Sequence, residues 1–292
     1  MRVIVILGPT GVGKTKLSVE LAKKLNGEII SGDSVQVYRK LDIGTAKVTK
    51  DEMGLVPHHL IDILDVGDDY SVADFQREVR DKIKDISERG RTPIICGGTG
   101  LYIKAALTDY QFSEGLKRDR NKYADKSNEE LYSLLQEIDP ESAKIFHPNN
   151  RVRVLRAIEY FYETKEPISR RKSKDIYLYD ARIIGLTMPR DSLYEKINKR
   201  VDIMLEKGLL NEVKSLYEKR SIINAIGYNE LFDYLDNKLT IEDAVERIKQ
   251  NSRRYAKRQY TWFNNQMDVF WIDISGLSSD EILERSIAFL NE

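Results

Sequence analysis

The chain has 292 residues, of which 41% are hydrophobic and 32% charged, a composition that suits one large domain or a core with an inserted subdomain. Its 47 basic residues balance its 47 acidic residues, which argues against a general polyanion binder but allows local basic patches. The single cysteine, Cys96, excludes an internal disulfide and predicts a reducing, cytoplasmic location. No apolar run approaches the length of a membrane span, so we expect no membrane partner.

A phosphate-binding motif opens the chain. The apolar run at residues 3–7 predicts a buried strand, and residues 16–25 carry apolar side chains at helical spacing. Between them stands Gly8-Pro9-Thr10-Gly11-Val12-Gly13-Lys14-Thr15, which fits the P-loop pattern G-x-x-x-x-G-K-[ST]. Backbone amides and the helix N-terminus of such a loop bind oxyanions, Lys14 adds a point charge, and Thr15 would hold Mg²⁺ through its hydroxyl. We therefore predict a site for a diphosphate or triphosphate.

Strands and helices alternate through the first hundred residues. We predict further strands at 28–31, 59–64 and 93–96, a helix from Ser71 to about Glu88, and a helix from Leu101. The predicted fold is α/β, a P-loop NTPase-like parallel sheet core with helices on both faces.

The sequence changes character near residue 110. From about 117 to 174 it is helical and charged, with helices predicted at 128–138 and 149–163. A strand is predicted at 181–186, and long helices at 192–216 and 241–263. We predict a core interrupted by a helical insertion, divided at 1–112, 113–178 and 179–292.

Polar residues follow two of the predicted strands. Asp33 and Ser34 come after one strand, and Gly97-Gly98-Thr99-Gly100 comes after another. Ligands of parallel α/β sheets bind beyond the carboxyl ends of the strands. Asp33 is either a metal ligand or helix cap, or a general base that faces a substrate beside the phosphates, and the spacing does not decide between these roles. The turn allows close backbone approach and offers the Thr99 hydroxyl.

Two stretches are locally basic. Residues 151–172 hold seven basic and three acidic side chains, and residues 244–263 hold six basic and one acidic. The second stretch interleaves basic residues with aromatic ones, which suits phosphate contact and base stacking, although a solvated helix face is the alternative. The histidines lack the spacing of a zinc site.

These residues together resemble the tRNA dimethylallyltransferase family, also called tRNA isopentenyltransferases, over nearly the whole chain. Beyond the P-loop, the resemblance rests on segments 30–38 (ISGDSVQVY), 42–47 (DIGTAK), 57–62 (PHHLID), 97–102 (GGTGLY), 147–150 (HPNN), 225–228 (AIGY) and 256–263 (AKRQYTWF).

The resemblance implies transfer of a dimethylallyl group from dimethylallyl diphosphate to the exocyclic amine of the adenosine 3′ to the anticodon, with Mg²⁺ as cofactor and no ATP hydrolysis. It implies that Asp33, Thr99 and Lys14 are catalytic, Asp33 by accepting a proton from the amine or hydrogen-bonding it. The residues it assigns to the prenyl diphosphate are Gly8, Thr10, Gly11, Val12, Gly13, Lys14, Thr15 and Arg200; for Arg200, a salt bridge within its helix is the alternative.

The resemblance also implies that the insertion grips the anticodon stem-loop of tRNA. Val152 stands where the family often has Gln, which leaves Arg153 and Arg156 as contacts of that segment. The further residues assigned to tRNA are Asp33, Ser34, Val35, Gln36, Thr99, Arg118 or Arg120, Gly227, Tyr228, Arg253, Arg254, Lys257 and Arg258. We expect a monomer.

Three other functions compete with this one. A P-loop kinase would need ATP and an acceptor pocket in place of an RNA surface. An isopentenyltransferase that acts on free adenine nucleotide shares the fold but should lack the insertion. A module that only binds tRNA would show no turnover.

Overall fold

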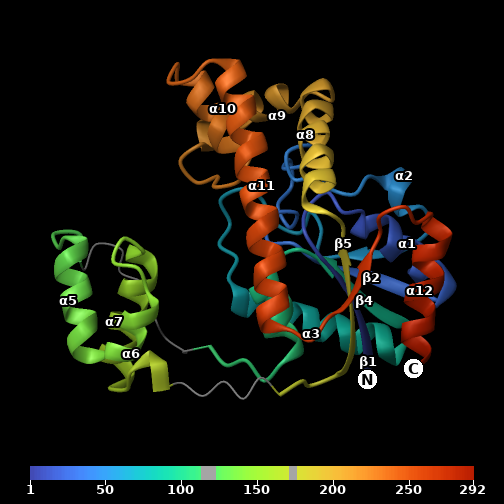
Figure 1. Ribbon diagram of the computed structural model, residues 1–292, viewed down its shortest axis with the longest axis horizontal. Coiled ribbons are helices and arrows are strands. Elements are labelled where there is room, and N and C mark those ends of the chain that lie inside the picture. The colour runs from blue at the N-terminus through green and yellow to red at the C-terminus, as the bar shows by residue number, and fades with distance from the viewer. Residues whose placement is uncertain (113–122, 171–175) are drawn as a thin grey trace. The chain divides into compact units, whose positions relative to one another are not determined.

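The computed structural model describes residues 1–112, 123–170 and 176–292 (Figure 1). These residues divide into two compact units, one of Met1–Thr108 with Tyr177–Glu292 and the other of Asp109–Ile176. No helix that the structure describes is long and apolar enough to cross a membrane.

The first unit is built on one parallel sheet. Its strands are β1 (Arg2–Leu7), β2 (Gly27–Gly32), β3 (His58–His59), β4 (Thr92–Gly97), β5 (Asp180–Thr187) and β6 (Phe270–Asp273), in the order β3-β2-β4-β1-β5-β6. Every strand pair is parallel, so the carboxyl ends of the strands share one edge of the sheet. The predicted α/β parallel-sheet fold is confirmed.

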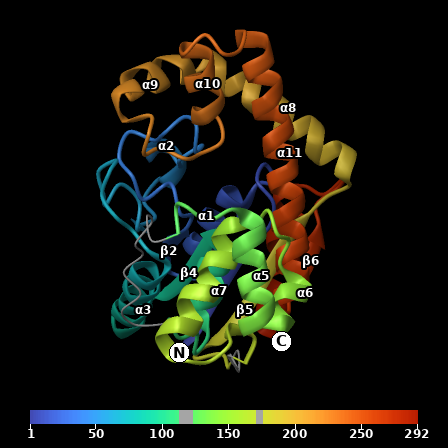
Figure 2. The same cartoon turned by 90° about the vertical axis from the view of Figure 1, so that its left-hand side faces the viewer.

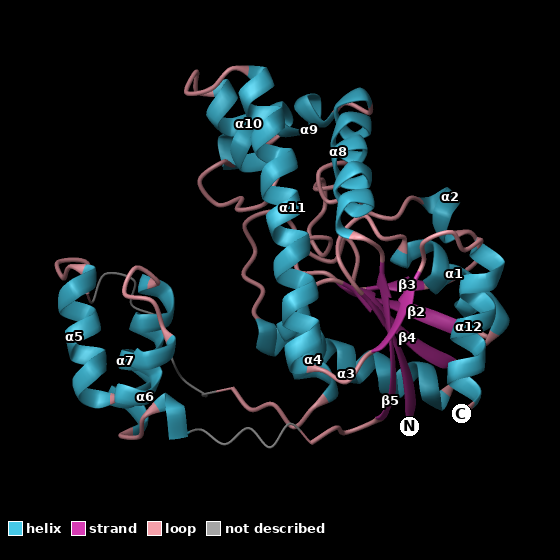
Figure 3. Ribbon diagram, viewed as in Figure 1, coloured by secondary structure: helices cyan, strands magenta, loops and turns pink. Residues whose placement is uncertain are grey.

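Helices cover both faces of this sheet (Figure 3). In β1, Ile4 and Ile6 face a hydrophobic cluster with α1 (Lys14–Lys24) and α12 (Ser279–Asn291), whereas Val3 and Val5 face one with α3 (Val72–Glu88) and α4 (Gly100–Leu107). Because successive strand residues point to opposite faces, a strand covered on both sides must be apolar throughout, as β1 is.

The first unit, which the structure describes throughout, holds five further α-helices and a short 3-10 helix at Tyr217–Lys219. The five α-helices are α2 (Lys50–Met53), α8 (Arg190–Glu206), α9 (Leu209–Ser215), α10 (Tyr228–Leu235) and α11 (Ile241–Gln266). A third hydrophobic cluster joins α8 to α11 and includes Leu41 from the segment that follows β2. The 26-residue helix α11 runs from this cluster down to the sheet, where Phe263 is fully buried (Figure 1).

The second unit is a small helical bundle of α5 (Asn128–Ile138), α6 (Pro140–Ile145) and α7 (Arg151–Thr164), with α5 and α7 side by side (Figure 2). Asp139 is buried because it caps α6, its carboxylate accepting the backbone N–H of Ser142 at 3.1 Å and of Ser169 at 3.0 Å.

Several predicted elements differ from the structure. The strand predicted at 59–64 ends at His59, because Leu60 and Asp62 take left-handed backbone angles with φ of 60° and 55°. The helix predicted at 192–216 is broken at Gly208, whose φ is 96°. Residues 270–273, 228–235 and 279–291 form β6, α10 and α12, which were not predicted.

A buried carboxylate joins β2, β3 and the end of α3. Glu28 is 1% exposed, and it pairs with Arg89, with Arg91 Nη1 at 2.8 Å and with His59 Nε2 at 2.7 Å. The hydrogen bonds from Arg89 lower the pKa of Glu28 to about 2. A carboxyl group whose pKa is lowered by folding stabilises the fold above its unfolded pKa, and that stability is lost as pH falls toward 2.

We expect Glu28→Gln to lower the free energy of unfolding by about 2 kcal/mol at pH 7, below the range of a fully buried pair because both arginines remain partly solvated. Urea unfolding should show this loss, and it should shrink as pH falls below about 4.5. Glu88→Gln, at an exposed i, i+4 pair with Lys84, is the matched control. An unfolding midpoint equal to that of the control would contradict the prediction.

Candidate active site

The P-loop leaves the sheet at the end of β1. Gly8, Gly11 and Gly13 have φ of 140°, 83° and 100°, values that side chains rarely adopt. At Gly8, a Cβ atom would also lie 2.5 Å from the carbonyl oxygen of Leu186 in β5. The loop therefore needs glycine both for its turns and for its approach to the neighbouring strand.

Lys14 begins α1 and folds back over the loop. Its ammonium donates to the carbonyl oxygens of Gly8 at 3.0 Å and Pro9 at 2.8 Å. Its pKa is lowered to about 8, mainly by burial and to a smaller extent by the nearby Arg200 guanidinium, while Cys96 and Asp33 oppose the shift. A bound anion would reverse this effect, because an opposite charge favours the charged form.

Two cavities meet at this edge of the sheet. The first, of about 400 Å³, contains the P-loop and Lys14, and the second, of about 360 Å³, is walled on one side by residues 224–227. Their linings share five residues: Thr10, Asp33, Thr45, Arg200 and Tyr255. A group bound in one cavity can therefore meet a group bound in the other at these shared residues.

Asp33 stands where the two cavities meet. Its Oδ1 accepts the backbone N–H groups of Val35 at 2.8 Å and Gln36 at 3.2 Å, so the carboxylate caps its own turn. Among the described residues, Oδ2 has no hydrogen-bond partner. Thr99 lies beside this turn, and its Oγ1 accepts the backbone N–H of Ser34 at 3.2 Å. One carboxylate oxygen thus fixes the turn and leaves the other for a ligand.

Arg200 projects from α8 to the P-loop. Its Nη1 donates to Thr10 Oγ1 at 3.2 Å, and burial lowers the pKa of its guanidinium. The hydrogen bond of Arg200 thus goes to the P-loop, and no ion pair within α8, a helix that the structure describes throughout, engages this side chain.

Two side chains of α11 were missed by sequence reasoning. Tyr255 lines both cavities, and burial followed by the charge of Asp33 raises its pKa to about 12. Gln259, one helical turn later, is 6% exposed and lines the first cavity. A signal was present: polar side chains at i and i+4 of a helix lie on one face, and a buried Gln in that face needs partners.

The residues predicted to bind tRNA lie in different settings. Arg254, Lys257 and Arg258 are exposed on α11, whereas Arg253 pairs with Glu246 and Asn198 of the same unit. In the second unit, α7 carries an exposed Arg153 and a half-buried Arg156. Arg118 and Arg120 lie outside the described residues.

Tyr228 differs from that expectation. It is fully buried, and its hydroxyl donates to Glu212 Oε1 at 2.6 Å. Gly227 before it is buried as well. The buried Tyr228 side chain therefore packs against Gly44 and Glu212 of its own unit and has no surface to offer to tRNA.

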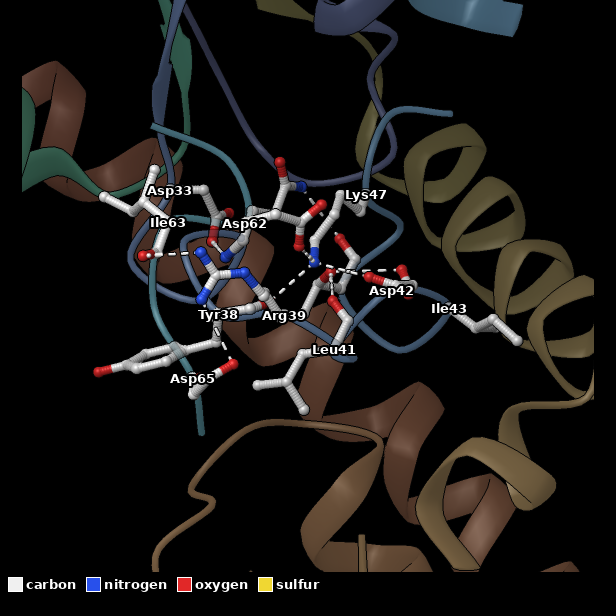
Figure 4. Close-up of polar contacts among 12 residues, drawn as sticks. Asp33, Tyr38, Arg39, Leu41, Asp42, Ile43, Lys47, Asp62, Ile63 and Asp65 are labelled. Atoms are coloured by element: carbon white, nitrogen blue, oxygen red, sulfur yellow. Dashed lines mark hydrogen bonds and ion pairs between the residues drawn. The ribbon is translucent and has the colours of Figure 1, made fainter. Parts of the chain in front are cut away.

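Opposite charges hold the cavity-lining segment 42–47 from two sides. Lys47, with a side chain 5% exposed, donates to Asp42 at 2.6 Å, Asp62 at 2.5 Å and the carbonyl oxygen of Tyr38 at 2.8 Å (Figure 4). From the other side, the Glu212 carboxylate accepts the backbone N–H groups of residues 42, 43 and 44 at 2.8 to 3.1 Å. These contacts place Thr45 in the wall of both cavities.

Comparison with known proteins gives the family. The profile of the IPP transferase family matches residues 36–266. The chain belongs to this family. It is 54% identical to the tRNA dimethylallyltransferase of Bacillus cereus, over 97% of this chain and 93% of that protein.

Solved structures agree with this assignment. The tRNA delta(2)-isopentenylpyrophosphate transferase of Staphylococcus epidermidis is 48% identical with a TM-score of 0.76, covering 99% of this chain and 98% of its own. A eukaryotic dimethylallyltransferase acting on tRNA is 32% identical with a TM-score of 0.85, covering 99% of this chain and 79% of its own.

We expect Lys14 to make anion binding depend on pH. Below pH 8 the protonated ammonium binds inorganic diphosphate, and above pH 8 binding must first supply a proton, which weakens it by up to about tenfold per pH unit. Calorimetry from pH 7 to 9.5 measures this, with Lys14→Met as control for titration of the ligand itself. The ratio of the diphosphate affinity of wild type to that of Lys14→Met should fall as pH rises. A ratio that stays constant with pH would contradict the prediction.

Proposed function

We propose that the two cavities divide the substrates of a tRNA dimethylallyltransferase between them. The chain transfers a dimethylallyl group from dimethylallyl diphosphate to the exocyclic amine of the adenosine 3′ to the anticodon, and releases diphosphate. The observation that carries the division is the set of five residues common to both cavities. Prenyl diphosphate occupies the P-loop cavity, and the flipped adenine occupies the second.

The P-loop side neutralises the leaving group. Lys14, the backbone amides of residues 11–15 and Arg200 surround the place of the diphosphate, so charge that develops on it as the allylic C–O bond breaks is balanced. Thr15 is exposed and lines this cavity, and a hydroxyl together with diphosphate oxygens suits the oxygen preference of Mg²⁺. A magnesium ion held there would add positive charge beside the diphosphate.

The second cavity serves the acceptor. An exocyclic amine of adenine is a weak nucleophile, and it becomes a stronger one as a carboxylate takes up or hydrogen-bonds its proton. Asp33 Oδ2 is placed for this role, because Oδ1 is already engaged by the turn. Thr99, Ser34 and the adjoining Val35 and Gln36 would border the entering nucleotide.

Basic residues would hold the remainder of the anticodon stem-loop. The exposed Arg254, Lys257 and Arg258 of α11 offer phosphate contacts, and Arg258 also lines the second cavity. Arg153 and Arg156 of α7 would add contacts from the inserted unit, so residues 113–178 act as a tRNA-binding insertion. The single cysteine supports a cytoplasmic location, and we propose that the chain acts as a monomer.

Label transfer tests the function. Protein and Mg²⁺ are incubated with radiolabelled dimethylallyl diphosphate and either unmodified tRNA or AMP. Label in tRNA alone is the expected result, whereas label in AMP alone would assign the chain to enzymes of free nucleotides. Label in neither would return the P-loop kinase to consideration, to be tested with labelled ATP.

We expect Asp33→Asn to lower the transfer rate by about 10²- to 10⁴-fold, the usual range for an acid–base group. The amide oxygen can still accept the backbone N–H groups of the turn, so tRNA affinity should change little. Asp69→Asn, at an exposed carboxylate, is the control. Single-turnover rates close to wild type would exclude the role of Asp33 as a base.

We expect Arg254→Ala to weaken tRNA binding and to flatten its salt dependence by about 0.7 to 0.9 in log–log slope, the effect of one lost phosphate contact. Filter binding between 50 and 200 mM salt, about a fourfold range, measures the slope. Lys84→Ala on α3, at an exposed lysine, serves as control. An unchanged slope would show that Arg254 makes no phosphate contact.

A further inference from the structure

Gln259 makes two hydrogen bonds with backbone groups on either side of the active site. Its Oε1 accepts the backbone N–H of Thr10 in the P-loop, and its Nε2 donates to the carbonyl oxygen of Gly98, each at 2.9 Å. The side chain is 6% exposed, so both bonds are shielded from water. One amide therefore bridges the loop that follows β1 and the turn that follows β4.

Each backbone group that Gln259 contacts is linked in turn to a side chain of the proposed active site. On the P-loop side, the hydroxyl of Thr10 accepts the guanidinium of Arg200 at 3.2 Å. On the turn side, Gly98 precedes Thr99, whose Oγ1 accepts the backbone N–H of Ser34, next to Asp33. The position of the Gln259 side chain thus affects Arg200, which is proposed to bind the diphosphate, and Asp33, which is proposed to act on the acceptor amine.

The fit around the amide is close. A Cβ atom at Gly98 would lie 2.2 Å from Gln259 Nε2, so this turn position has room for hydrogen only. Tyr255, one turn earlier on α11, lines both cavities beside the bridge. The bridge also engages the Thr10 N–H, which leaves the amides of residues 11–15 for an anion.

We propose that Gln259 is a positioning residue that sets the separation of the diphosphate loop and the acceptor turn, and thereby aligns the two substrates. This inference rests on the proposed function, because alignment matters only where a group passes between the cavities. The role needs one donor and one acceptor on the same side chain. Glutamine supplies both, an ionised glutamate lacks the donor, and methionine lacks both at similar volume.

The helix that carries Gln259 also carries the basic residues proposed to contact tRNA. Arg254, Lys257 and Arg258 are exposed on α11, whereas Tyr255 and Gln259 face the cavities. A substitution at Gln259 should therefore disturb the diphosphate site and leave the outer tRNA contacts in place. This separation distinguishes a positioning role from a general loss of structure.

The test compares Gln259→Met and Gln259→Glu with Gln250→Met and Gln250→Glu, the same changes at an exposed position of the same helix. For Gln259→Met, we expect the KM for dimethylallyl diphosphate and the Kd for inorganic diphosphate to rise by about 10- to 100-fold, the effect of two lost hydrogen bonds. The KM for tRNA and the melting temperature should stay close to the controls, because the outer phosphate contacts of α11 remain. Loss of alignment at Asp33 should instead lower the single-turnover transfer rate at saturating concentrations of both substrates. Gln259→Glu should raise the KM for dimethylallyl diphosphate and the Kd for inorganic diphosphate further than Gln259→Met does, because its carboxylate would face the carbonyl oxygen of Gly98.

Gly98→Ala provides an independent variant should Gln259→Met fail to fold, since its methyl group displaces the amide while Gln259 remains. For Gly98→Ala we again expect a raised KM for dimethylallyl diphosphate and a KM for tRNA close to the controls. A Kd for inorganic diphosphate within twofold of the wild-type value would overturn the positioning role. So would a rise in the KM for both substrates together with a lower melting temperature, because that pattern indicates a general loss of structure. Failure of the proposed function is distinct, because wild type itself would then transfer no label.

Discussion

The close approach of β1 to β5 is the constraint from which the active site follows. The two strands pair in parallel up to Leu7 and Gly185, and the carbonyl oxygen of Leu186 then occupies the space that a side chain at Gly8 would need. The chain turns away from the sheet there and enters α1 at Lys14, whose ammonium returns to the first carbonyl groups of the loop. The anion site is thus formed by backbone at the carboxyl edge of the sheet, where parallel α/β folds place their ligands.

Ion pairs and hydrogen bonds, rather than regular secondary structure, hold the acceptor side. Residues 33–49 contain no helix or strand, and Lys40 and Ala46 have left-handed backbone angles. Lys47 holds this segment through carboxylates and a carbonyl group, and Glu212 holds it through backbone N–H groups. A carboxylate that accepts several N–H groups satisfies its lone pairs as fully as a helix cap does, so the segment keeps a defined shape.

The elements that depend on neighbouring residues could be predicted from the sequence, whereas the features that depend on contacts between distant residues were missed. The P-loop, the apolar strand before it and the capped helix α3 follow from neighbouring residues, and all are present. The strand β3 is short because Leu60 and Asp62 have left-handed backbone angles, and the apolar pattern of residues 59–64 gave no indication of these angles. The helical spacing of Tyr255 and Gln259 could mark a shared face, but the partners of Gln259 could not be identified from sequence patterns because they lie 249 and 161 residues away. Tyr228 shows the same limit, since its burial depends on Glu212 and Gly44.

A P-loop suits the binding of a diphosphate, but it does not define the reaction. Kinases, hydrolases and transferases could all use the amides of residues 11–15 and the charge of Lys14. What differs is the group admitted opposite the phosphates. Under the proposed function, that group would meet Asp33 in a cavity walled by segments 44–45 and 224–227. A cavity of about 360 Å³ has room for a nucleobase as well as water, so under the proposed function a bound base would exclude water from the allylic carbon of the neighbouring prenyl diphosphate. Selectivity for transfer over hydrolysis therefore depends on how well the acceptor base fills this cavity.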